Sequence, residues 1–293
     1  MEKDKNRKDV TISDEVVSVR PKSRQMLNKV PEITILFWII KVMATTVGET
    51  AADFLNTNLN LGLTVTTIIM SGLLIITLLY QFKVNKYVPS IYWLAVVLIS
   101  VVGTLITDNL VDNFGVPLKT TTIIFSIALI VTFVVWYASE KTLSIHSIFT
   151  TKREAFYWFA ILFTFALGTA AGDLMAEGLG LGYSNSAAMF AVMIGVVATA
   201  FYRLKLNSVV AFWIAYILTR PLGASLGDFL SQSRVDGGLA LGTVGTSEIF
   251  LITILSIVIF LTIRNRAHSK IAENVGNESF KTKTGRDEDL LVD

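Results

Sequence analysis

Residues 37–55 read FWIIKVMATTVGETAADFL, an apolar segment that nevertheless carries Lys41, Glu49 and Asp53. A charged side chain in membrane hydrocarbon is costly, so such residues usually have a function. The tryptophan, glycine and aspartate of this segment recur at the same spacing. The four copies are Trp38, Gly48, Asp53; Trp93, Gly103, Asp108; Trp158, Gly168, Asp173; and Trp213, Gly223, Asp228. The pattern W-x9-G-x4-D therefore indicates an internal repeat.

The composition is that of a membrane protein. The 293 residues are 53% apolar and include no cysteine. Eight apolar runs approach or exceed the roughly 18 residues needed to span a bilayer. They lie at about 33–54, 61–82, 88–108, 117–138, 155–175, 186–204, 207–230 and 247–264. We predict an all-α, polytopic membrane protein with about eight transmembrane helices, built as four two-helix repeats.

The repeats cover about 31–85, 86–140, 151–205 and 206–265, so the transmembrane domain is predicted over 31–265. A unit with two spans returns to its starting side, so successive repeats are parallel and not inverted. We expect the four first helices to form a ring around a central axis, with the second helices outside. Two four-helix halves related by a pseudo-twofold axis are the alternative.

Basic residues predict the orientation. Of the 25 Lys and Arg residues, 21 fall on one side of the predicted spans, and Lys119 and Arg234 fall on the other. The positive-inside rule then places both termini in the cytoplasm. Residues 1–30 are predicted to be a polar cytoplasmic segment and 266–293 a disordered cytoplasmic tail. Each repeated Trp would lie near the cytoplasmic end of its helix, where aromatic belts form.

A polar stripe runs along the first helix of the first repeat. Lys41, Thr45, Glu49 and Asp53 are spaced by four residues and share one helix face. Glu49 and the four repeated Asp residues outnumber Lys41 and Arg220, the two basic residues within spans, by five to two. Unpaired buried carboxylates must be protonated or bind cations. The alternative is that the charges only pair with each other and that the Asp residues end their helices.

From this stripe we assign candidate roles. The expected cation- or proton-binding residues are Glu49, Asp53, Asp108, Asp173 and Asp228, with Glu49 and Asp53 as the candidate metal ligands. Lys41, Thr45, Thr46 and Arg220 are expected to support them as counter-charges or oxygen donors. Gly48, Gly103, Gly168 and Gly223 are expected to allow close packing of helices.

The available side chains narrow the chemistry. Without cysteine, and with His146 and His268 outside the predicted spans, the chain is unsuited to zinc or copper(I). Carboxylate, hydroxyl and carbonyl oxygens suit hard ions such as Mn²⁺, Mg²⁺ or Ca²⁺. The sequence contains no HExxH, GxSxG, Walker or kinase motif and no nucleic-acid motif. We therefore expect no enzyme activity, no nucleic-acid partner and no cofactor besides a transported cation.

Residues 30–56, VPEITILFWIIKVMATTVGETAADFLN, resemble the signature of a family of repeat-containing bacterial inner-membrane proteins described as uncharacterised membrane-anchored proteins. In that family a W…K…TT-x-GE-x-x-AD core recurs in degenerate copies. The resemblance covers about 29–265 and implies a multi-pass protein of the bacterial cytoplasmic membrane, without implying a substrate. The later repeats have Thr104, Thr169 and Ala224 in place of Glu49, so any site is asymmetric.

Three functions compete on this evidence. The leading hypothesis is a proton-coupled secondary transporter or exporter, an antiporter, of a hard divalent cation such as Mn²⁺ or Mg²⁺. The alternative is a proton-coupled transporter of a small organic solute, including an anionic one. The third is a membrane assembly or sensor protein that transports nothing. The expected partners are the lipid bilayer and the transported cation or small molecule, and a homo-oligomer is compatible with the sequence.

Overall fold

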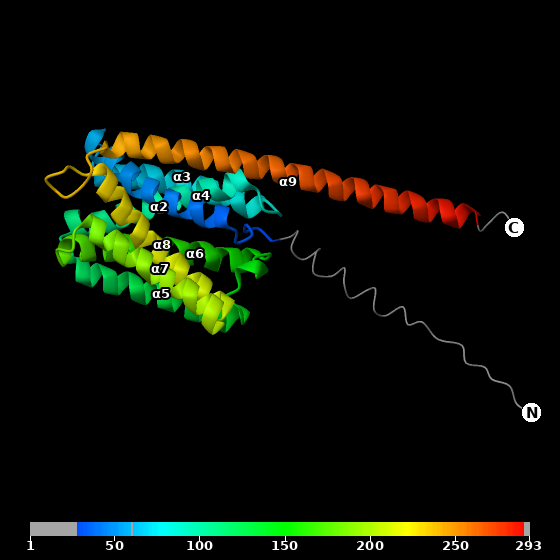
Figure 1. Ribbon diagram of the computed structural model, residues 1–293, viewed down its shortest axis with the longest axis horizontal. Helices are drawn as coiled ribbons and strands as arrows, with labels where there is room; N and C mark the ends of the chain where they lie inside the picture. The colour runs from blue at the N-terminus through cyan, green and yellow to red at the C-terminus, as the bar shows by residue number, and fades with distance from the viewer. Residues whose placement is uncertain (1–27, 60, 290–293) are drawn as a thin grey trace, which may run out of the picture.

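The computed structural model describes residues 28–59 and 61–289 as a bundle of helices (Figure 1). The first helices of the repeats are α2 (Ile35–Asp53), α4 (Pro89–Asp108), α6 (Thr151–Asp173) and α8 (Ser208–Ser231). The second helices are α3 (Leu63–Lys83), α5 (Leu118–Glu140), α7 (Tyr183–Leu204) and α9 (Gly242–Asp289). Eight helices in the described ranges are long and apolar enough to cross a membrane, and none of the described residues forms a strand. The prediction of eight spans is confirmed.

The four first helices form a closed inner ring. Helix α2 packs against α4, α4 against α6, α6 against α8, and α8 against α2. Each second helix packs mainly against the inner helix of the following repeat: α3 on α4, α5 on α6, α7 on α8, and α9 on α2. The last contact closes the circle between the two ends of the chain. Of the two arrangements considered from the sequence, the structure has the ring.

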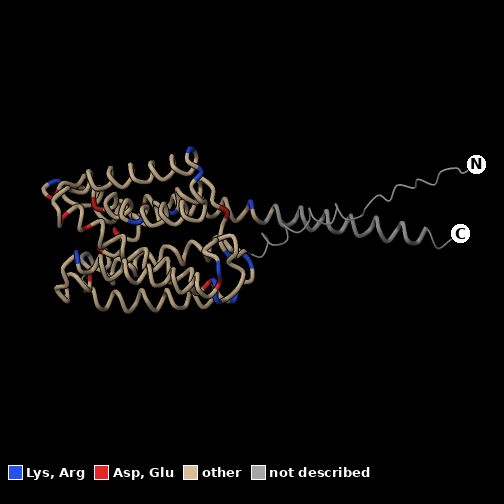
Figure 2. Tube along the Cα trace, turned by 90° about the horizontal axis from the view of Figure 1, so that it is seen from below, with Lys and Arg blue, Asp and Glu red and all other residues tan. Residues whose placement is uncertain are grey.

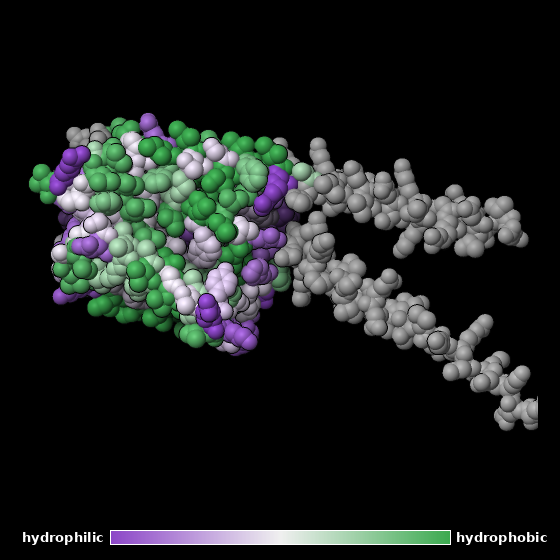
Figure 3. Space-filling view, viewed as in Figure 1, coloured by the Kyte–Doolittle hydropathy of each residue, from purple (hydrophilic) through white to green (hydrophobic). Residues whose placement is uncertain are grey.

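The outer helices form the surface that faces lipid. In α4, 72% of the spanning window is buried, whereas in α7 the buried share is 6%. Large apolar side chains such as Ile76, Ile130 and Val196 are exposed on the outer helices. Figure 3 shows apolar residues over most of the visible face of the bundle, with polar residues gathered toward its two ends. An apolar surface of this kind matches the hydrocarbon layer of a bilayer.

The repeated glycines lie where inner helices touch. A Cβ atom on Gly48 would overlap Ser100 of α4, and one on Gly103 would lie 2.7 Å from Cβ of Phe165 on α6. The same pattern continues around the ring, with Gly168 against Arg220 of α8 and Gly223 against Thr45 of α2. Each glycine therefore contacts the next repeat. Small residues at helix crossings are the usual means of bringing backbones together in membranes.

Three inner helices end in a π-helical turn. These turns are η1 (Phe54–Asn58), η2 (Asn109–Asn113) and η4 (Leu174–Gly178), and each starts directly after the repeated Asp. The fourth inner helix, α8, continues to Ser231. Isolated π-helical turns frequently occur at functional sites. This end of the ring therefore differs from the other end in backbone as well as in sequence.

The tryptophans do not form an interfacial belt as expected. Trp93, Trp158 and Trp213 are at most 5% exposed, and only Trp38 is half-buried. Each follows another aromatic residue, and the rings pack on one another across the ring of helices; the rings of Tyr92 and Trp158, for example, are 5.5 Å apart. Because two adjacent aromatic residues cover a wide sector of a helix, both become part of the core.

Two predicted boundaries need correction. Residues 1–27 lie outside the described part of the chain, but Asn28, Lys29 and Val30 are buried against the bundle and do not belong to a solvated segment. The predicted disordered tail is wrong for residues 266–289, because α9 continues as a helix to Asp289. Extending an existing helix avoids the cost of nucleation. In Figure 1 this extension projects from the end of the bundle at which α2 begins.

Candidate cation site

A cavity lined by carboxylates opens at the end of the inner ring where the π-helical turns lie. Its volume is ≈ 150 Å³. The acidic residues that line it are Glu49, Asp53, Asp108, Asp112, Asp173, Glu177 and Asp228, and they are joined by Asn56, Val111, Leu118 and Gln232. None of these described lining residues is lysine or arginine. We call this space the acidic cavity.

The carboxylates become more buried toward the ring axis. Asp112 and Glu177 are exposed at the mouth. Asp53, Asp108 and Asp173 are partly buried. Asp228 is buried, and Glu49 at the inner end of the cavity is 5% exposed. Figure 2 shows acidic residues concentrated in this half of the bundle and basic residues concentrated toward the opposite end. A field of this sign raises the local concentration of cations.

All four repeated aspartates thus reach one cavity, as the common register predicts. Three carboxylates come close enough to share one ion: oxygens of Glu49, Asp173 and Asp228 all lie within 4.8 Å of one another. The sequence pointed to Glu49 and Asp53 as the ligand pair. Within the described residues Asp53 lines the same cavity but is outside this group, and its carboxylate accepts a hydrogen bond from Gln232 at 3.4 Å. The closest group comes from α2, α6 and α8 because the ring closes.

Glu49 forms the floor of the cavity, and Arg220 lies directly beneath it, outside the lining residues. The Arg220 side chain is fully buried, and its Nη2 lies 2.9 Å from Oε2 of Glu49. The same nitrogen donates to the hydroxyls of Thr104 and of Thr169, the latter at 2.6 Å. Glu49, Thr104 and Thr169 occupy one position of the first three repeats, so Arg220 meets three helices at the axis. Glu49 therefore pairs with Arg220 and not with Lys41.

Lys41 lies on the far side of this floor from the cavity. It is fully buried, and its Nζ is 4.1 Å from the centre of the Phe165 ring and 4.2 Å from that of Tyr216. Nζ has no hydrogen-bond partner among the described residues. A desolvated cation–π contact contributes about 2 kcal/mol, whereas burying one ion costs several kcal/mol. Two ring faces thus offset only part of the cost of a charged amine.

Thr45 and Thr46 do not line the acidic cavity. The Thr45 hydroxyl donates to the backbone oxygens of Val42 and Thr219, and the Thr46 hydroxyl donates to that of Val42. The backbone oxygen of Thr45 accepts a long hydrogen bond from Arg220 at 3.5 Å. Their hydroxyls therefore help to hold α2 against α8, and the expected role as ion ligands has no geometric support.

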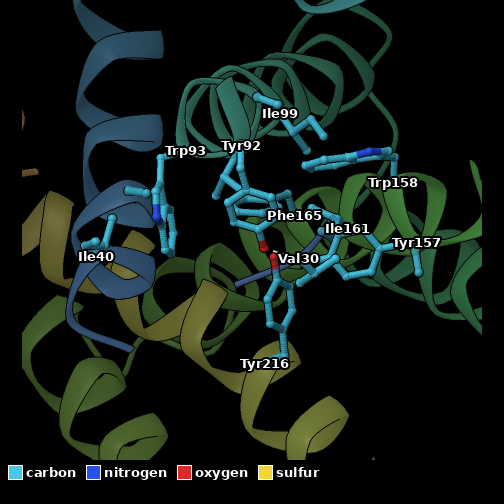
Figure 4. Packing of buried hydrophobic residues seen from close by; sticks show 14 of the residues in the cluster. Val30, Ile40, Tyr92, Trp93, Ile99, Tyr157, Trp158, Ile161, Phe165 and Tyr216 are labelled. Atoms are coloured by element: carbon cyan, nitrogen blue, oxygen red, sulfur yellow. Dashed lines mark hydrogen bonds between the residues drawn. The ribbon is translucent and has the colours of Figure 1, made fainter. Parts of the chain in front are cut away.

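The opposite end of the ring is closed by aromatic side chains. Tyr92 and Tyr157 share a hydrogen bond of 2.5 Å between their hydroxyls. Figure 4 shows these two residues grouped with Phe165 and Tyr216 at the centre of the bundle, and Val30 lies among them. The neighbouring Lys29 makes a buried ion pair of 2.6 Å with Glu154. The cavity is therefore open at one end of the ring and sealed toward the other.

Among the cavity residues that escaped the sequence pattern, three polar ones share one position of the repeat. Asp112, Glu177 and Gln232 each lie 19 residues after a repeated Trp, one further turn beyond the repeated Asp. Because the predicted spans end near the Asp residues, the sequence places this position in the connections between spans. The π-helical turns extend two of these helices past the Asp and keep Asp112 and Glu177 on the cavity side. Adding a W-x18-[DEQ] position to the repeat would have identified them.

The repeats match a known family model, described as Repeat of Unknown Function (DUF347), at residues 36–87, 91–142, 156–207 and 211–267. The four matches together cover well over half of the chain. The chain belongs to the DUF347 repeat family. Each DUF347 match contains most of one inner helix and the whole of one outer span, so the family repeat is the two-helix unit of the bundle. No curated protein and no solved structure matches the chain.

Proposed function

We propose that this DUF347 protein is a secondary transporter that exchanges a hard divalent cation, such as Mn²⁺ or Mg²⁺, for protons. The observation that carries the proposal is the acidic cavity, in which seven carboxylates converge and the innermost of them, Glu49, pairs with Arg220. Oxygen ligands of this kind suit hard cations, and the chain supplies no thiolate. Carboxylates at this depth of a membrane protein commonly mark ion pathways.

The size of the cavity favours an ion over a larger solute. At about 30 Å³ per water molecule, ≈ 150 Å³ holds roughly five waters. That volume accommodates one partly hydrated ion between the carboxylates. Pockets for drug-sized organic ligands measure about 300–1,000 Å³. An organic solute is therefore the less suitable cargo for this site.

The closed end supports transport by alternating access. The acidic cavity ends at the Arg220–Glu49 pair, and beyond it lie Lys41 and the Tyr92–Tyr157 contact. An ion that enters the cavity must wait for these layers to separate before it leaves at the other side. Since no nucleotide-binding motif is present, a gradient of protons or other ions is the energy source in this proposal.

Binding by the purified protein tests the proposal. We expect Mn²⁺ or Mg²⁺ to raise the unfolding temperature, because a ligand at 100 times its Kd stabilises the folded state by about 2.7 kcal/mol. Asp173→Asn and Asp228→Asn should remove most of this stabilisation. Asp236→Asn is the matched control, because Asp236 is exposed in the connection between α8 and α9 and does not line the cavity.

Transport is then measured in vesicles that contain a divalent-cation dye and a pH dye. Divalent flux with opposite proton flux is the expected result, and Asp173→Asn should abolish both. Stabilisation by organic acids alone would instead favour the organic-solute hypothesis. The absence of both binding and flux for every divalent cation tested would leave the carboxylates with a structural role and refute the proposal.

A further inference from the structure

We propose that the amine of Lys41 carries a proton that the protein exchanges for its divalent cation. This inference rests on the proposed function and assigns one coupling residue within it. It starts from an unusual environment: a fully buried Nζ with two aromatic faces and no hydrogen-bond partner among the described residues. This environment is unfavourable for a permanently charged ammonium, because the part of the chain that the structure describes offers it no hydrogen-bond acceptor and no counter-ion.

Of the two basic side chains buried at the ring axis, only Lys41 is suited to carry the proton. Arg220 is held by Glu49, Thr104 and Thr169, and a guanidinium does not release its proton in proteins. Lysine shifts readily between charged and neutral forms when it is buried. With the Glu49–Arg220 pair neutral overall, the charge on the axis beneath the cavity changes when Lys41 gains or loses a proton.

The surroundings of Lys41 contain few competing groups. Tyr216 of α8 faces Nζ, Arg220 lies one turn further along α8, and Glu49 follows two turns later on α2. Tyr92 of α4 and Tyr157 of α6 belong to the same aromatic cluster as Tyr216 (Figure 4). Helix α9 also packs on α2, but its ionisable residues with described side chains, Glu248 and Arg264, are exposed. Among the described residues, no carboxylate forms an ion pair or a hydrogen bond with Nζ. Nothing of that kind therefore keeps the ammonium permanently charged.

The position of Lys41 couples it to the ion. Glu49 is the eighth residue after Lys41, which corresponds to about 12 Å along a helix. A divalent ion at Glu49, Asp173 and Asp228 repels a positive charge on Lys41, and the protein interior screens this repulsion weakly. Ion binding therefore favours the neutral amine, and by reciprocity protonation of Lys41 weakens ion binding. Competition of this kind is what an exchanger requires.

Calorimetric titration of the whole protein with Mn²⁺, in buffers of different ionisation heat, counts the protons released per ion bound. We expect Lys41→Met to release one proton fewer than the wild type. Linkage makes affinity change by up to about tenfold per pH unit for each proton exchanged, so the pH dependence should become shallower by up to that factor. Lys119→Met is the control, because Lys119 is exposed beside the cavity residue Leu118 and should release the wild-type number.

Lys41→Arg separates a coupling role from a packing role. Arginine keeps the charge, so this variant should also release one proton fewer, but it should bind Mn²⁺ more weakly than Lys41→Met at neutral pH. A residue that only packs the core would shift both variants in the same direction and leave the proton count unchanged. An unchanged count in either folded variant overturns this inference while leaving the proposed function in place. If the wild-type protein binds no divalent cation, both this inference and the proposed function are refuted.

Discussion

Arg220 is the residue that joins the four repeats at the centre of the ring. Its fully buried guanidinium contacts side chains from the other three inner helices. The stem of Arg220 passes over Gly168, where a Cβ atom would overlap it. In its own repeat, the position of Glu49 is taken by the small Ala224. Arg220 can therefore occupy the axis because Gly168 in the third repeat leaves room for its stem and Glu49 in the first repeat balances its charge.

The ion pair at the axis predicts a specific pattern of stability. Arg220→Met leaves Glu49 buried without its cation, and breaking a buried pair in this way costs about 3–5 kcal/mol. Adding Glu49→Gln removes the orphaned charge and should recover most of that loss, as a double-mutant cycle would show. The free energy of unfolding of the single and double variants, measured in mixed detergent micelles, tests this expectation.

Arg153→Met provides the comparison at the other end of the bundle, because Arg153 pairs with the partly exposed Glu140 at 2.8 Å. It should cost much less than Arg220→Met, because solvent screens a pair near the surface. A double variant as unstable as the sum of its single changes would mean that Arg220 and Glu49 act independently.

At the scale of elements, the crossings between inner helices set the geometry of the cavity. The glycine ten residues after each Trp brings its helix against the next one, and the Asp five residues later then faces the common axis. Three of the helices continue into π-helical turns that carry the outermost carboxylates or amides. The spacing between adjacent inner helices therefore determines how closely the carboxylates approach each other.

A substitution at one crossing tests this dependence. Gly103→Ala would place Cβ 2.7 Å from Cβ of Phe165 and 3.1 Å from the backbone nitrogen of Ala166, so helices α4 and α6 must move apart. Overpacking of this kind costs about 1–3 kcal/mol. Gly72→Ala on the lipid-facing side of α3 meets no atom within 4 Å and should be neutral or slightly stabilising. Equal unfolding temperatures for the two variants would contradict the role of Gly103.

The repeat motif predicted these inner helices well because Trp, Gly and Asp each have a position-specific role. It could not predict that α9 packs on α2 or that α3 packs on α4, because a lipid-facing helix has no polar pattern that specifies which helix it packs against. The Arg220–Glu49 pair also escaped prediction, since it joins the first and last repeats and exists only once the ring closes. Asp112 was missed because a π-helical turn has no clear sequence signal.

As a whole, the molecule has two chemically different ends. The acidic cavity opens at one end, where the inner helices finish, and the buried Lys29–Glu154 pair lies at the other, where they start. In the connections between the described spans and at the adjoining helix ends, Lys and Arg gather on the second side, at Lys83, Lys86, Lys141, Lys152, Arg153, Arg203 and Lys205, and only Lys119 and Arg234 fall on the cavity side. The positive-inside rule then predicts that the cavity faces away from the cytoplasm.

Labelling of single cysteines tests this orientation directly, because the natural chain has no cysteine. An impermeant maleimide applied to intact cells should label Asn113→Cys and Ser233→Cys at the cavity end. Lys86→Cys and Lys205→Cys at the other end should react only after the membrane is permeabilised. The reverse pattern would place the cavity on the cytoplasmic side, and a mixed pattern would contradict eight spans.

The packing of α9 on α2 has a consequence for how the protein is made. Helix α2 leaves the ribosome before the other seven described spans, yet the helix that covers its outer face begins only at Gly242. At roughly 5–20 residues per second, α2 waits on the order of ten to forty seconds for this neighbour. For most of that time Lys41 and Glu49 are in or near the membrane without the Arg220 that completes the axis. The nascent chain must therefore shelter these charges, at the translocon or with a chaperone, until the last repeat arrives.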